Sequence, residues 1–553
     1  MPTLNWIGKE AVVNHHHHVP FHLLKDVPDL SCGEPGSGNL IVQGDNLVAL
    51  KALLPYYAGQ VKCVYIDPPY NTGNESWKYN DNVNSPIIRE WLDKVVGKEG
   101  ETLDRHDRWL CMMYPRLRLL HQFLRSDGVI FVSIDEFELG NLLVLFDEIF
   151  GPRHRIGIFT WQRKKKGSHL DAHLRKMTEH VLCYAKNKEE LGGLFGEDAY
   201  ADKLQPLVKR TNKEKPLTFP AGSVSTGLAD GIYEAGFRGK TGTGLNFLEA
   251  FSVEDGSITT ELKVLGNFVW TQRKLDEEIG LGTTIELSRK FGLNVGRHDQ
   301  SEKSKTPTTL LTPNIGIGTN EDASEFLSGI FNQEMGKAFP YSKPVSLIQY
   351  LVRSATKDEP SAIIMDSFAG SGSTAHAVLN LNSEDDGERR FVVVELDGAI
   401  AREITSERVR MVSEGYTNSR GEEVEALGGG FRYCELGEPL FDESGKIRDT
   451  VKFADLARHV WFTETGEPLP RERVPNSPVL GVFRGVAIYL LYNGILGDKS
   501  AAGGNVLTRT VLADLPKHSG QKVIYCAGCL LGSERLRVEG IAIRQTPYEI
   551  KVS

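Results

Sequence analysis

The chain has 553 residues, of which 40% are hydrophobic and 25% are charged, values that are ordinary for a soluble globular protein of several domains. No apolar run is long enough to cross a bilayer, and the N-terminus lacks the basic and apolar regions of a secretory signal, so we expect no membrane segment. The net charge of −9 excludes a protein that coats nucleic acid non-specifically but leaves room for a local DNA-binding surface, and seven scattered cysteines suit a reducing cytoplasm.

Two short motifs raise the question of a metal site, and we predict none. His15 to His18 form a run without ligand-type spacing to other histidines or cysteines, and we interpret it as a polar surface loop. Cys526-Ala527-Gly528-Cys529 has the spacing of a zinc knuckle, but no second pair of cysteines or histidines stands nearby. We interpret this segment as a turn between two strands.

The first regular unit is predicted for residues 39–190, after an N-terminal extension of residues 1–38. Apolar runs predict buried strands, and apolar residues at helical spacing predict helices between and after them. Strands that alternate with helices in this way are typical of a parallel α/β sheet. The predicted strands are residues 40–42, 61–66 and 128–134, and the predicted helices are residues 47–54, 114–124 and 139–150.

A basic stretch closes this unit. Between Arg153 and Lys188 there are ten Lys or Arg residues and two Asp or Glu residues. Its centre is the run Arg163-Lys164-Lys165-Lys166, which follows Trp161 closely. A run of charge alone is commonly a solvated face, but beside a catalytic region it becomes a candidate for contact with DNA phosphates.

The regular pattern breaks down over residues 191–331 and then returns. This stretch is rich in Gly, Thr, Lys and Pro and is too long for a plain loop, so we predict an inserted domain of short strands, Phe268-Val269-Trp270 among them. Residues 332–427 again alternate strands and helices, which predicts one doubly wound sheet split around the insert. A third unit, residues 428–553, shows no chemistry that can be named. The later predicted strands are residues 362–365, 391–394, 482–483, 486–491, 523–525 and 540–543, and the later predicted helices are residues 345–354, 374–380 and 399–412.

The segment Asp67-Pro68-Pro69-Tyr70 directly follows the second predicted strand. Ligands bind beyond the carboxyl ends of the strands in an open α/β sheet, and two prolines make this loop rigid. An exocyclic amino nitrogen is a poor nucleophile because its lone pair is delocalised. The Asp67 carboxylate and the Pro68 carbonyl can accept its two hydrogens, and Tyr70 can stack on a base drawn out of the helix. A plain turn before a Pro-Pro stop is the alternative interpretation.

The segment from Asp366 to Thr374 joins a predicted strand to a helix through a glycine-rich turn. It does not fit the dinucleotide fingerprint, and it lacks the Lys of a phosphate-binding loop, which disfavours nucleotide hydrolysis. Gly370 and Gly372 allow a ligand to lie against the backbone. Glu395 ends the next strand, where an acid can accept hydrogen bonds from a ribose. The combination favours an adenosine-type ligand without a polyphosphate over a purely structural turn.

With both loops in this order, the chain resembles the β-class amino-methyltransferases of DNA, in which the catalytic tetrapeptide precedes a target-recognition domain and then the cofactor region. The two loops start 299 residues apart, and the predicted insert falls between them. The chain is most similar to the modification subunits of Type III restriction–modification systems. Further segments that carry this resemblance are Gly44-Asp45-Asn46-Leu47, the extended loop Asp67 to Gly73, Lys343-Pro344 and Gln545-Thr546-Pro547-Tyr548.

The resemblance implies a Rossmann-like, circularly permuted methyltransferase sheet that uses S-adenosylmethionine, with the insert as target-recognition domain and an α+β domain at the C-terminus. It implies that Asp67, Pro68, Pro69 and Tyr70 hold and activate the target amine. Asp366 is expected near the amino-acid end of the cofactor, Glu395 near its ribose, Asp45 near its adenine and Lys343 near its carboxylate. The other implied cofactor residues are Phe368, Ala369, Gly370, Ser371, Gly372, Ser373 and Thr374.

The implied reaction is direct methyl transfer to the N6 amino group of adenine in double-stranded DNA, without a covalent enzyme intermediate. Trp161 and the run Arg163 to Lys166 would contact phosphates or fill the gap left by a flipped base. The resemblance also implies a homodimer, a helicase–nuclease restriction subunit as a further partner, and a bacterial or archaeal cytoplasm.

Two kinds of alternative stay open. The first is another methyl acceptor: cytosine N4, RNA or a protein amide nitrogen. Asp67 favours adenine, because cytosine-N4 enzymes more often begin this tetrapeptide with Ser and protein-amide enzymes with Asn. The second is a catalytically silent DNA-recognition subunit, against which both intact loops argue.

Overall fold

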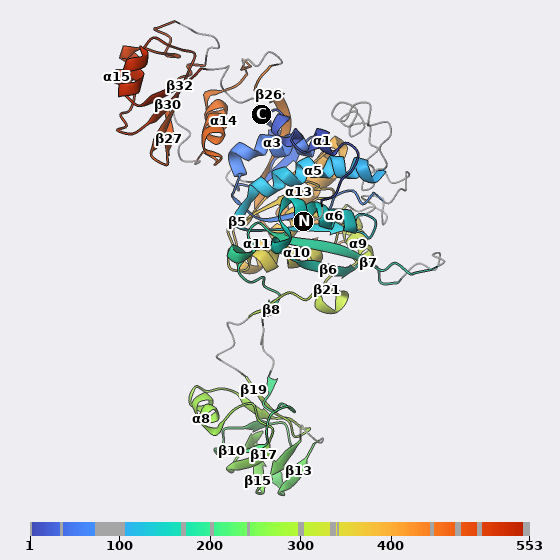
Figure 1. Ribbon diagram of the computed structural model, residues 1–553. Helices are drawn as coiled ribbons and strands as arrows, with labels where there is room; N and C mark the ends of the chain where they lie inside the picture. Colours follow the sequence, from blue (N-terminus) through green and yellow to red (C-terminus); the bar gives the residue numbers. More distant parts are fainter. Residues whose placement is uncertain are drawn as a thin grey trace. The chain divides into compact units, whose positions relative to one another are not determined.

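The computed structural model divides the chain into two compact units, Met1–Leu194 with Thr308–Ser553 and, separately, Phe195–Pro307 (Figure 1). The smaller unit is shorter than the insert predicted at residues 191–331. β21 (Leu310–Leu311) and α9 (Asn320–Phe331) belong to the larger unit, where β21 pairs with β6 (Arg155–Gln162). The described residues are 3–33, 37–71, 105–166, 173–198, 204–239, 244–296, 304–331, 339, 342–442, 447–448, 450–469, 477–494 and 500–545.

The larger unit is built on an 11-stranded sheet in the order β1-β26-β3-β23-β22-β4-β5-β7-β6-β21, with β2 paired to β26. The strands from β26 to β5 are parallel, and β7 is antiparallel to both of its neighbours. Strands β22 and β23 follow the insert in sequence but lie between β3 and β4, so the prediction of one split sheet is confirmed. The bounds are β1 (His22–Asp26), β2 (Cys32–Gly33), β3 (Leu40–Gln43), β4 (Val61–Ile66), β5 (Leu124–Ile134), β7 (Thr178–Ala185), β22 (Ile363–Asp366), β23 (Arg390–Glu395) and β26 (Gly430–Pro439).

The central strands are buried on both faces. Val64 and Ile66 of β4 join one apolar cluster, whereas Cys63 and Tyr65 join another. Successive side chains of a strand point to opposite faces, so a strand that is apolar throughout must be covered on both sides. All six residues of β4 are buried, which explains why five of them are apolar; the exception, Lys62, forms an ion pair with Asp127.

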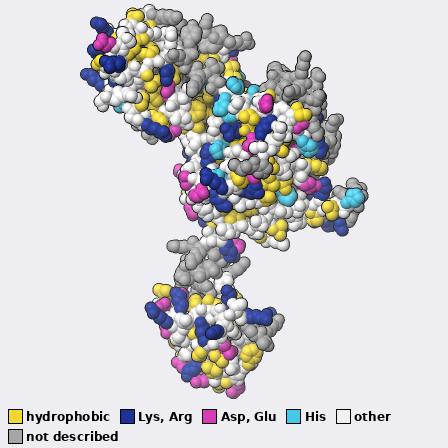
Figure 2. All heavy atoms as spheres, in the orientation of Figure 1, with side chains coloured by type: hydrophobic (Ala, Val, Ile, Leu, Met, Phe, Trp, Pro, Cys, Tyr) yellow, Lys and Arg dark blue, Asp and Glu magenta, His cyan; other side chains and the backbone are white. Residues whose placement is uncertain are grey.

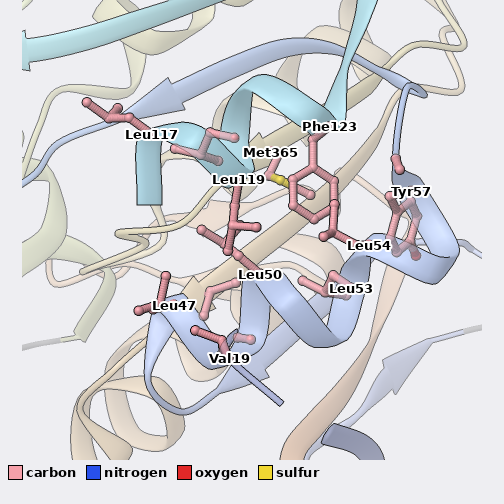
Figure 3. Packing of buried hydrophobic residues seen from close by; sticks show 14 of the residues in the cluster. Val19, Leu47, Leu50, Leu53, Leu54, Tyr57, Leu117, Leu119, Phe123 and Met365 are labelled. Carbon is pink, nitrogen blue, oxygen red and sulfur yellow. The ribbon is translucent and has the colours of Figure 1, made fainter. Parts of the chain in front are cut away.

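Helices supply the cover on each face. α3 (Asn46–Tyr57), α5 (Arg105–Phe123) and α6 (Leu139–Ile149) contribute to the first cluster. α10 (Val345–Thr356), α11 (Ser373–Asp385) and α13 (Ser406–Glu414) contribute to the second. Figure 3 shows Leu50 and Leu54 of α3 packed with Leu119 and Phe123 of α5. The helix predicted at residues 399–412 is interrupted by a π-helical turn, Ala401–Thr405, between α12 (Gly398–Ile400) and α13.

The smaller unit has its own apolar core, two main sheets and the helix α8 (Gln272–Gly280). The prediction of a strand at Phe268-Val269-Trp270 is wrong. Phe268 makes only an isolated bridge with Val208, and Thr271 already caps α8. Phe268 and Trp270 are apolar because they anchor this turn in the core. The strands are β8 (Glu197–Asp198), β9 (Gln205–Pro206), β10 (Lys215–Phe219), β11 (Ser225–Thr226), β12 (Gly231–Tyr233), β13 (Gly236–Arg238), β14 (Leu245–Phe247), β15 (Phe251–Glu254), β16 (Ser257–Ile258), β17 (Leu262–Gly266), β18 (Ile285–Leu287), β19 (Leu293–Val295) and β20 (Ser304–Lys305).

The C-terminal part forms a separate sheet in the order β27-β28-β30-β32, and strands lie where the sequence predicted them. Cys526 ends β30 and Cys529 lies in β31, and Ala527 alone separates the two strands, as predicted for a turn between strands. Residues 546–548, which carry part of the family resemblance, lie outside the described residues. The elements are β24 (Tyr416–Thr417), β25 (Glu423–Val424), α14 (Phe453–Thr465), β27 (Val479–Phe483), β28 (Val486–Leu490), β29 (Val506–Leu507), α15 (Arg509–Asp514), β30 (Lys522–Cys526), β31 (Gly528–Cys529), α16 (Ser533–Val538) and β32 (Ile541–Gln545).

The histidine run is not the surface loop that we predicted. It forms the short helix α2 (His15–His18), which follows α1 (Lys9–Val12), and His16 is 1% exposed. Lys51 of α3 donates a hydrogen bond to the His16 carbonyl over 3.0 Å, and burial lowers the pKa of His16 to about 3. Within the described part of the chain, no group of three or more metal-ligating side chains is present, and no helix has the length and apolar character needed to cross a membrane.

Candidate active site

Four neighbouring parallel strands end at one edge of the sheet, and an acidic residue stands at or just beyond each end. The strands are adjacent in the order β3, β23, β22, β4. Their acids are Asp45, Glu395, Asp366 and Asp67, respectively. Because the carboxyl ends of adjacent parallel strands meet, the sheet brings the two predicted loops together despite the 299 residues between their first residues.

Asp67 has both carboxylate oxygens engaged by side chains. The Tyr70 hydroxyl donates to Oδ1 over 2.8 Å, and Lys343 Nζ donates to Oδ2 over 2.7 Å. The Asp67 and Lys343 side chains are only 12% and 6% exposed. Burial raises the pKa of Asp67 above its usual value, and the nearby Lys343 opposes this rise. The carboxylate is therefore oriented by two partners and paired with a buried cation.

The two proline carbonyls have different surroundings. Trp109 Nε1 of α5 donates to the Pro69 carbonyl over 2.6 Å. Among the described residues none donates to the Pro68 carbonyl, which keeps its full capacity to accept. Asn71 adopts a positive φ of 57° and donates to Glu138 Oε1 over 2.5 Å, which anchors the far end of the loop. Residues 72–73 of the predicted extended loop lie outside the described residues.

Glu179 of β7 completes this cluster, and sequence reasoning missed it. Its Oε1 accepts a hydrogen bond from Arg163 over 2.7 Å, and its Oε2 lies 3.1 Å from the Tyr70 hydroxyl, whose single hydrogen is shared with the nearer Asp67 Oδ1. The same Oε2 lies 3.7 Å from Lys343 Nζ, and the Glu179 side chain is 3% exposed. The available signal was a lone acid two residues before the apolar run Val181 to Ala185, since a buried carboxylate requires partners.

Asp366 is held differently. The Phe368 N–H donates to its Oδ1 over 2.9 Å, and the Thr374 hydroxyl donates to its Oδ2 over 2.5 Å. No Lys or Arg of the described chain forms an ion pair with it. Burial is the main cause that raises the pKa of Asp366 to about 7. This carboxyl group therefore holds the turn together, and near pH 7 about half of it is protonated.

The backbone of the glycine-rich loop is held by Glu395, Thr405 and Arg408, and its serine side chains point into the protein. Gly370 and Gly372 have φ values of 51° and 79°. The Ser371 and Ser373 hydroxyls both accept from Arg408, over 3.0 and 2.9 Å, and both serines are buried. Arg408 was not predicted, and burial lowers its pKa to about 9. The assignment of Ser371 and Ser373 as cofactor residues stays a prediction; in this arrangement Arg408 holds their hydroxyls.

The other predicted cofactor residues tie the edge of the sheet together. Glu395 accepts from the Gly370 N–H over 2.8 Å and from the Asp397 N–H over 2.9 Å. Asp45 caps α3 by accepting from the N–H groups of its first turn, and it pairs with Arg116 at 3.3 Å. Ala369 is buried, and Phe368 is partly exposed. Lys343, expected at the carboxylate of a cofactor, instead directs its ammonium to Asp67.

The predicted DNA-binding stretch separates into a buried and an exposed part. Trp161 is fully buried, and its Nε1 donates to the Gly318 carbonyl over 3.0 Å, so the expectation that it fills the gap left by a flipped base is wrong. Its ring instead packs in the apolar core from its place on β6. Arg163 is engaged with Glu179. Lys164 is partly exposed, Lys165 is exposed and pairs with Asp322, and Lys166 is exposed. Basic and acidic side chains are interspersed on the face shown in Figure 2.

The chemistry of this edge fits S-adenosylmethionine. Carboxylates at the four strand ends suit a ligand that carries hydroxyl groups and positive charge. The two glycines have positive φ and no side chain that would block a flat adenosine at this loop; Gly370 is partly exposed, whereas Gly372 is buried. Glu395 stands on the strand next to the glycine loop, which is the position from which an acid reaches a ribose.

The family model and the most similar curated proteins point to the same family. Residues 61–414 match the DNA methylase family. The Mod subunit of the Type III restriction-modification enzyme StyLTI from Salmonella typhimurium is 30% identical over 66% of this chain and 53% of its own length. The EcoPI Mod subunit from Escherichia phage P1 is 29% identical over 72% of this chain and 64% of its own length. The chain thus spans about half to two thirds of the length of these relatives. The Type II methyltransferase M.KpnI from Klebsiella pneumoniae is 26% identical over 73% of this chain and 94% of its own length.

The solved structures that match this chain are distant from it both in sequence and in structure. The cytosine-N4-specific PvuII DNA methyltransferase is 12% identical over 67% of this chain and 86% of its own, with a TM-score of 0.32. TTHA0409 from Thermus thermophilus, described as a DNA modification methylase, is 14% identical over 71% and 100%, with a TM-score of 0.31. The fold assignment therefore rests on the strand order of this chain.

Proposed function

Since this chain belongs to the DNA methylase family, we propose that it transfers a methyl group from S-adenosylmethionine to the N6 amino group of adenine in double-stranded DNA. One observation carries the proposal. The buried carboxylate of Asp67 and the unengaged carbonyl of Pro68 lie at the end of β4, and the glycine-rich loop follows the neighbouring strand β22. An amine acceptor site and an adenosine site are therefore one strand apart.

The residues of this chain act mainly by placement and polarisation. S-adenosylmethionine, when bound, supplies a methyl group on a sulfonium cation. The backbone of Gly370 to Gly372 and the Glu395 carboxylate would hold it. Asp67 and the Pro68 carbonyl would accept the two hydrogens of the target amine, which localises the nitrogen lone pair toward the methyl group. Asp67, whose pKa burial raises, can then hold the proton that the methylated nitrogen releases.

The choice of adenine rests on Asp67 as the first residue of the tetrapeptide. Both Type III Mod subunits described above are similar over most of this chain. This supports a role as the modification component of a Type III-like system in a bacterial cytoplasm, with a homodimeric assembly and a restriction subunit as partner. Light scattering on the purified chain, alone and with a co-purified restriction subunit, measures both associations.

The experiment that tests the proposed reaction uses the purified full chain, methyl-labelled S-adenosylmethionine and unmethylated DNA of mixed sequence. Direct reading of modified bases then identifies the product and its sequence context. We expect N6-methyladenine within one short motif. Product found only as N4-methylcytosine contradicts the base assignment, and cofactor binding without any transfer favours the silent recognition subunit.

A further inference from the structure

Both oxygens of Asp67, one of which the proposed reaction needs as an acceptor, already accept hydrogen bonds. The Lys343 ammonium donates to Oδ2 and the Tyr70 hydroxyl to Oδ1. The ammonium also lies 4.8 Å from the centre of the Tyr70 ring, so that it covers one face of this ring. A carboxylate neutralised by a contacting ammonium polarises a neutral amine weakly. The ammonium must therefore withdraw from Asp67 before the target base can be activated, and the Tyr70 hydroxyl can move away with it.

Neither donor can withdraw to solvent. Lys343 is 6% exposed and Tyr70 is 7% exposed. An ammonium that leaves its partner inside the protein is strongly disfavoured unless another anion receives it. Burial lowers the pKa of Lys343, but the Asp67 and Glu179 carboxylates outweigh this effect and hold its pKa above the usual value, so it stays charged.

Apart from Asp67 itself, Glu179 is the one carboxylate of the described chain that contacts both donors. Its Oε2 lies 3.1 Å from the Tyr70 hydroxyl and 3.7 Å from Lys343 Nζ. A movement of about 1 Å brings this ammonium to the distance of a charge-assisted hydrogen bond. Arg163 holds the other oxygen, Oε1, over 2.7 Å and so fixes Glu179 in place. Two buried carboxylates and two cations keep the cluster neutral before and after such a movement.

We propose that Glu179 is a positioning residue that receives the Lys343 ammonium and the Tyr70 hydroxyl when the target amine binds Asp67. The transfer of both donors from Asp67 to Glu179 couples entry of the base to activation of the carboxylate. Without a base, Lys343 keeps Asp67 neutralised. With a base, the same ammonium moves to Glu179, which also uncovers the face of the Tyr70 ring for stacking. This inference rests on the proposed methyl transfer.

The chain offers a matched control on the same pair of strands. Asp147 accepts from the Tyr184 hydroxyl over 2.7 Å and forms an ion pair with Arg155. Arg155 lies on β6 and Tyr184 on β7, the strand that also carries Glu179. Asp147→Asn therefore removes a carboxylate from a Tyr–Arg cluster without touching any residue of the site.

The test measures kcat and KM with methyl-labelled cofactor and DNA for Glu179→Gln, Glu179→Asp and Asp147→Asn in the full chain. We expect Glu179→Gln to lower kcat about 100-fold, because a misplacement of about 1 Å at the reacting groups has this effect, with KM for S-adenosylmethionine within about twofold of wild type. Glu179→Asp keeps the charge and should lose less, and Asp147→Asn should keep kcat. A kcat for Glu179→Gln equal to that of Asp147→Asn overturns the inference.

A double variant separates the transfer of the ammonium from simple damage to the site. In Glu179→Gln the ammonium has no second carboxylate and stays on Asp67. Adding Lys343→Met removes this ammonium, so the double variant should recover about tenfold or more of the kcat lost in Glu179→Gln. If the double variant instead has a kcat below that of Glu179→Gln, lower by the factor that Lys343→Met alone causes, the inference is overturned. Wild-type chain that transfers no methyl group to any DNA contradicts the proposed function, which is a different outcome.

Discussion

The two aspartates at the ends of β4 and β22 lie on adjacent strands, yet their surroundings differ in kind. Asp366 is held by a backbone N–H and by a hydroxyl of the helix that follows, within its own loop. Asp67 is held by side chains, and one of them, Lys343, comes from 276 residues away in sequence. Groups held by backbone stay in place, whereas side-chain partners can exchange. Asp366 thus maintains its loop, whereas the partners of Asp67 can exchange, as the proposed reaction requires.

The largest effect should come from Asp67→Asn. The amide keeps the shape of the carboxylate but loses its charge and one acceptor, so we expect transfer to fall about 1000-fold, the range seen when one preorganised polar group is removed from a site. Single-turnover transfer of a labelled methyl group measures this loss, and calorimetry should find cofactor binding unchanged. A methyl-transfer rate within about tenfold of wild type would mean that Asp67, like Asp366, only maintains the structure of its loop.

Asp366→Asn should act on stability through pH. Its folded pKa of about 7 lies above the ordinary value of 3.8. The folded chain therefore keeps a proton that the unfolded chain has lost, and wild-type stability falls as pH rises from about 4 to 7. Asparagine removes this dependence, so the variant should gain up to about 4 kcal/mol relative to wild type between about pH 4 and pH 8. Urea unfolding of wild type and variant at about pH 4 and pH 8 measures this gain. An equal difference in the free energy of unfolding at the two pH values would contradict the raised pKa of Asp366.

Gly372→Ala tests whether the backbone of the cofactor loop must stay in place. Gly372 has a φ of 79°, and an added Cβ would lie 3.3 Å from both the Thr405 carbonyl oxygen and its Cγ2. We expect a loss of stability of about 1–3 kcal/mol and a cofactor affinity weaker by about tenfold. Gly59→Ala is the control, because Gly59 has a φ of 65° with nothing within 4 Å. Equal losses of stability in the two variants would show that the positive φ, and not the contact with Thr405, causes the loss.

The smallest expected effect concerns the affinity for DNA. We expect the lysines near Arg163, on the side of the site that holds Asp67, to contact DNA phosphates. We expect Lys164→Ala with Lys166→Ala to reduce the slope of log affinity against log salt by about 1.8, or about 0.9 for each phosphate that is no longer neutralised. Lys165→Ala should reduce it less, because Lys165 already pairs with Asp322. Filter binding over a range of salt concentrations measures the slopes. Unchanged slopes in the double variant would make this run an ordinary solvated surface.

The sequence by itself determined the fold class and the two loops. Strands buried on both faces must be apolar throughout, and strand ends with Pro or Gly turns are recognisable locally, so β4, β22 and the loops after them were predictable. The same local logic misled us at Trp161, whose neighbouring charges suggested a surface, and at His16, which is buried within the N-terminal extension.

Only the tertiary structure decided which side chains meet Asp67. Glu179 lies on β7 and Lys343 precedes α10, and neither stands near Asp67 in sequence or in a motif that predicts a contact with it. Their meeting depends on strand order, with β4 two positions from β7, and on the turn before α10. A buried charge is recognisable only once burial is known, because the same Glu or Lys on a surface would carry no such meaning.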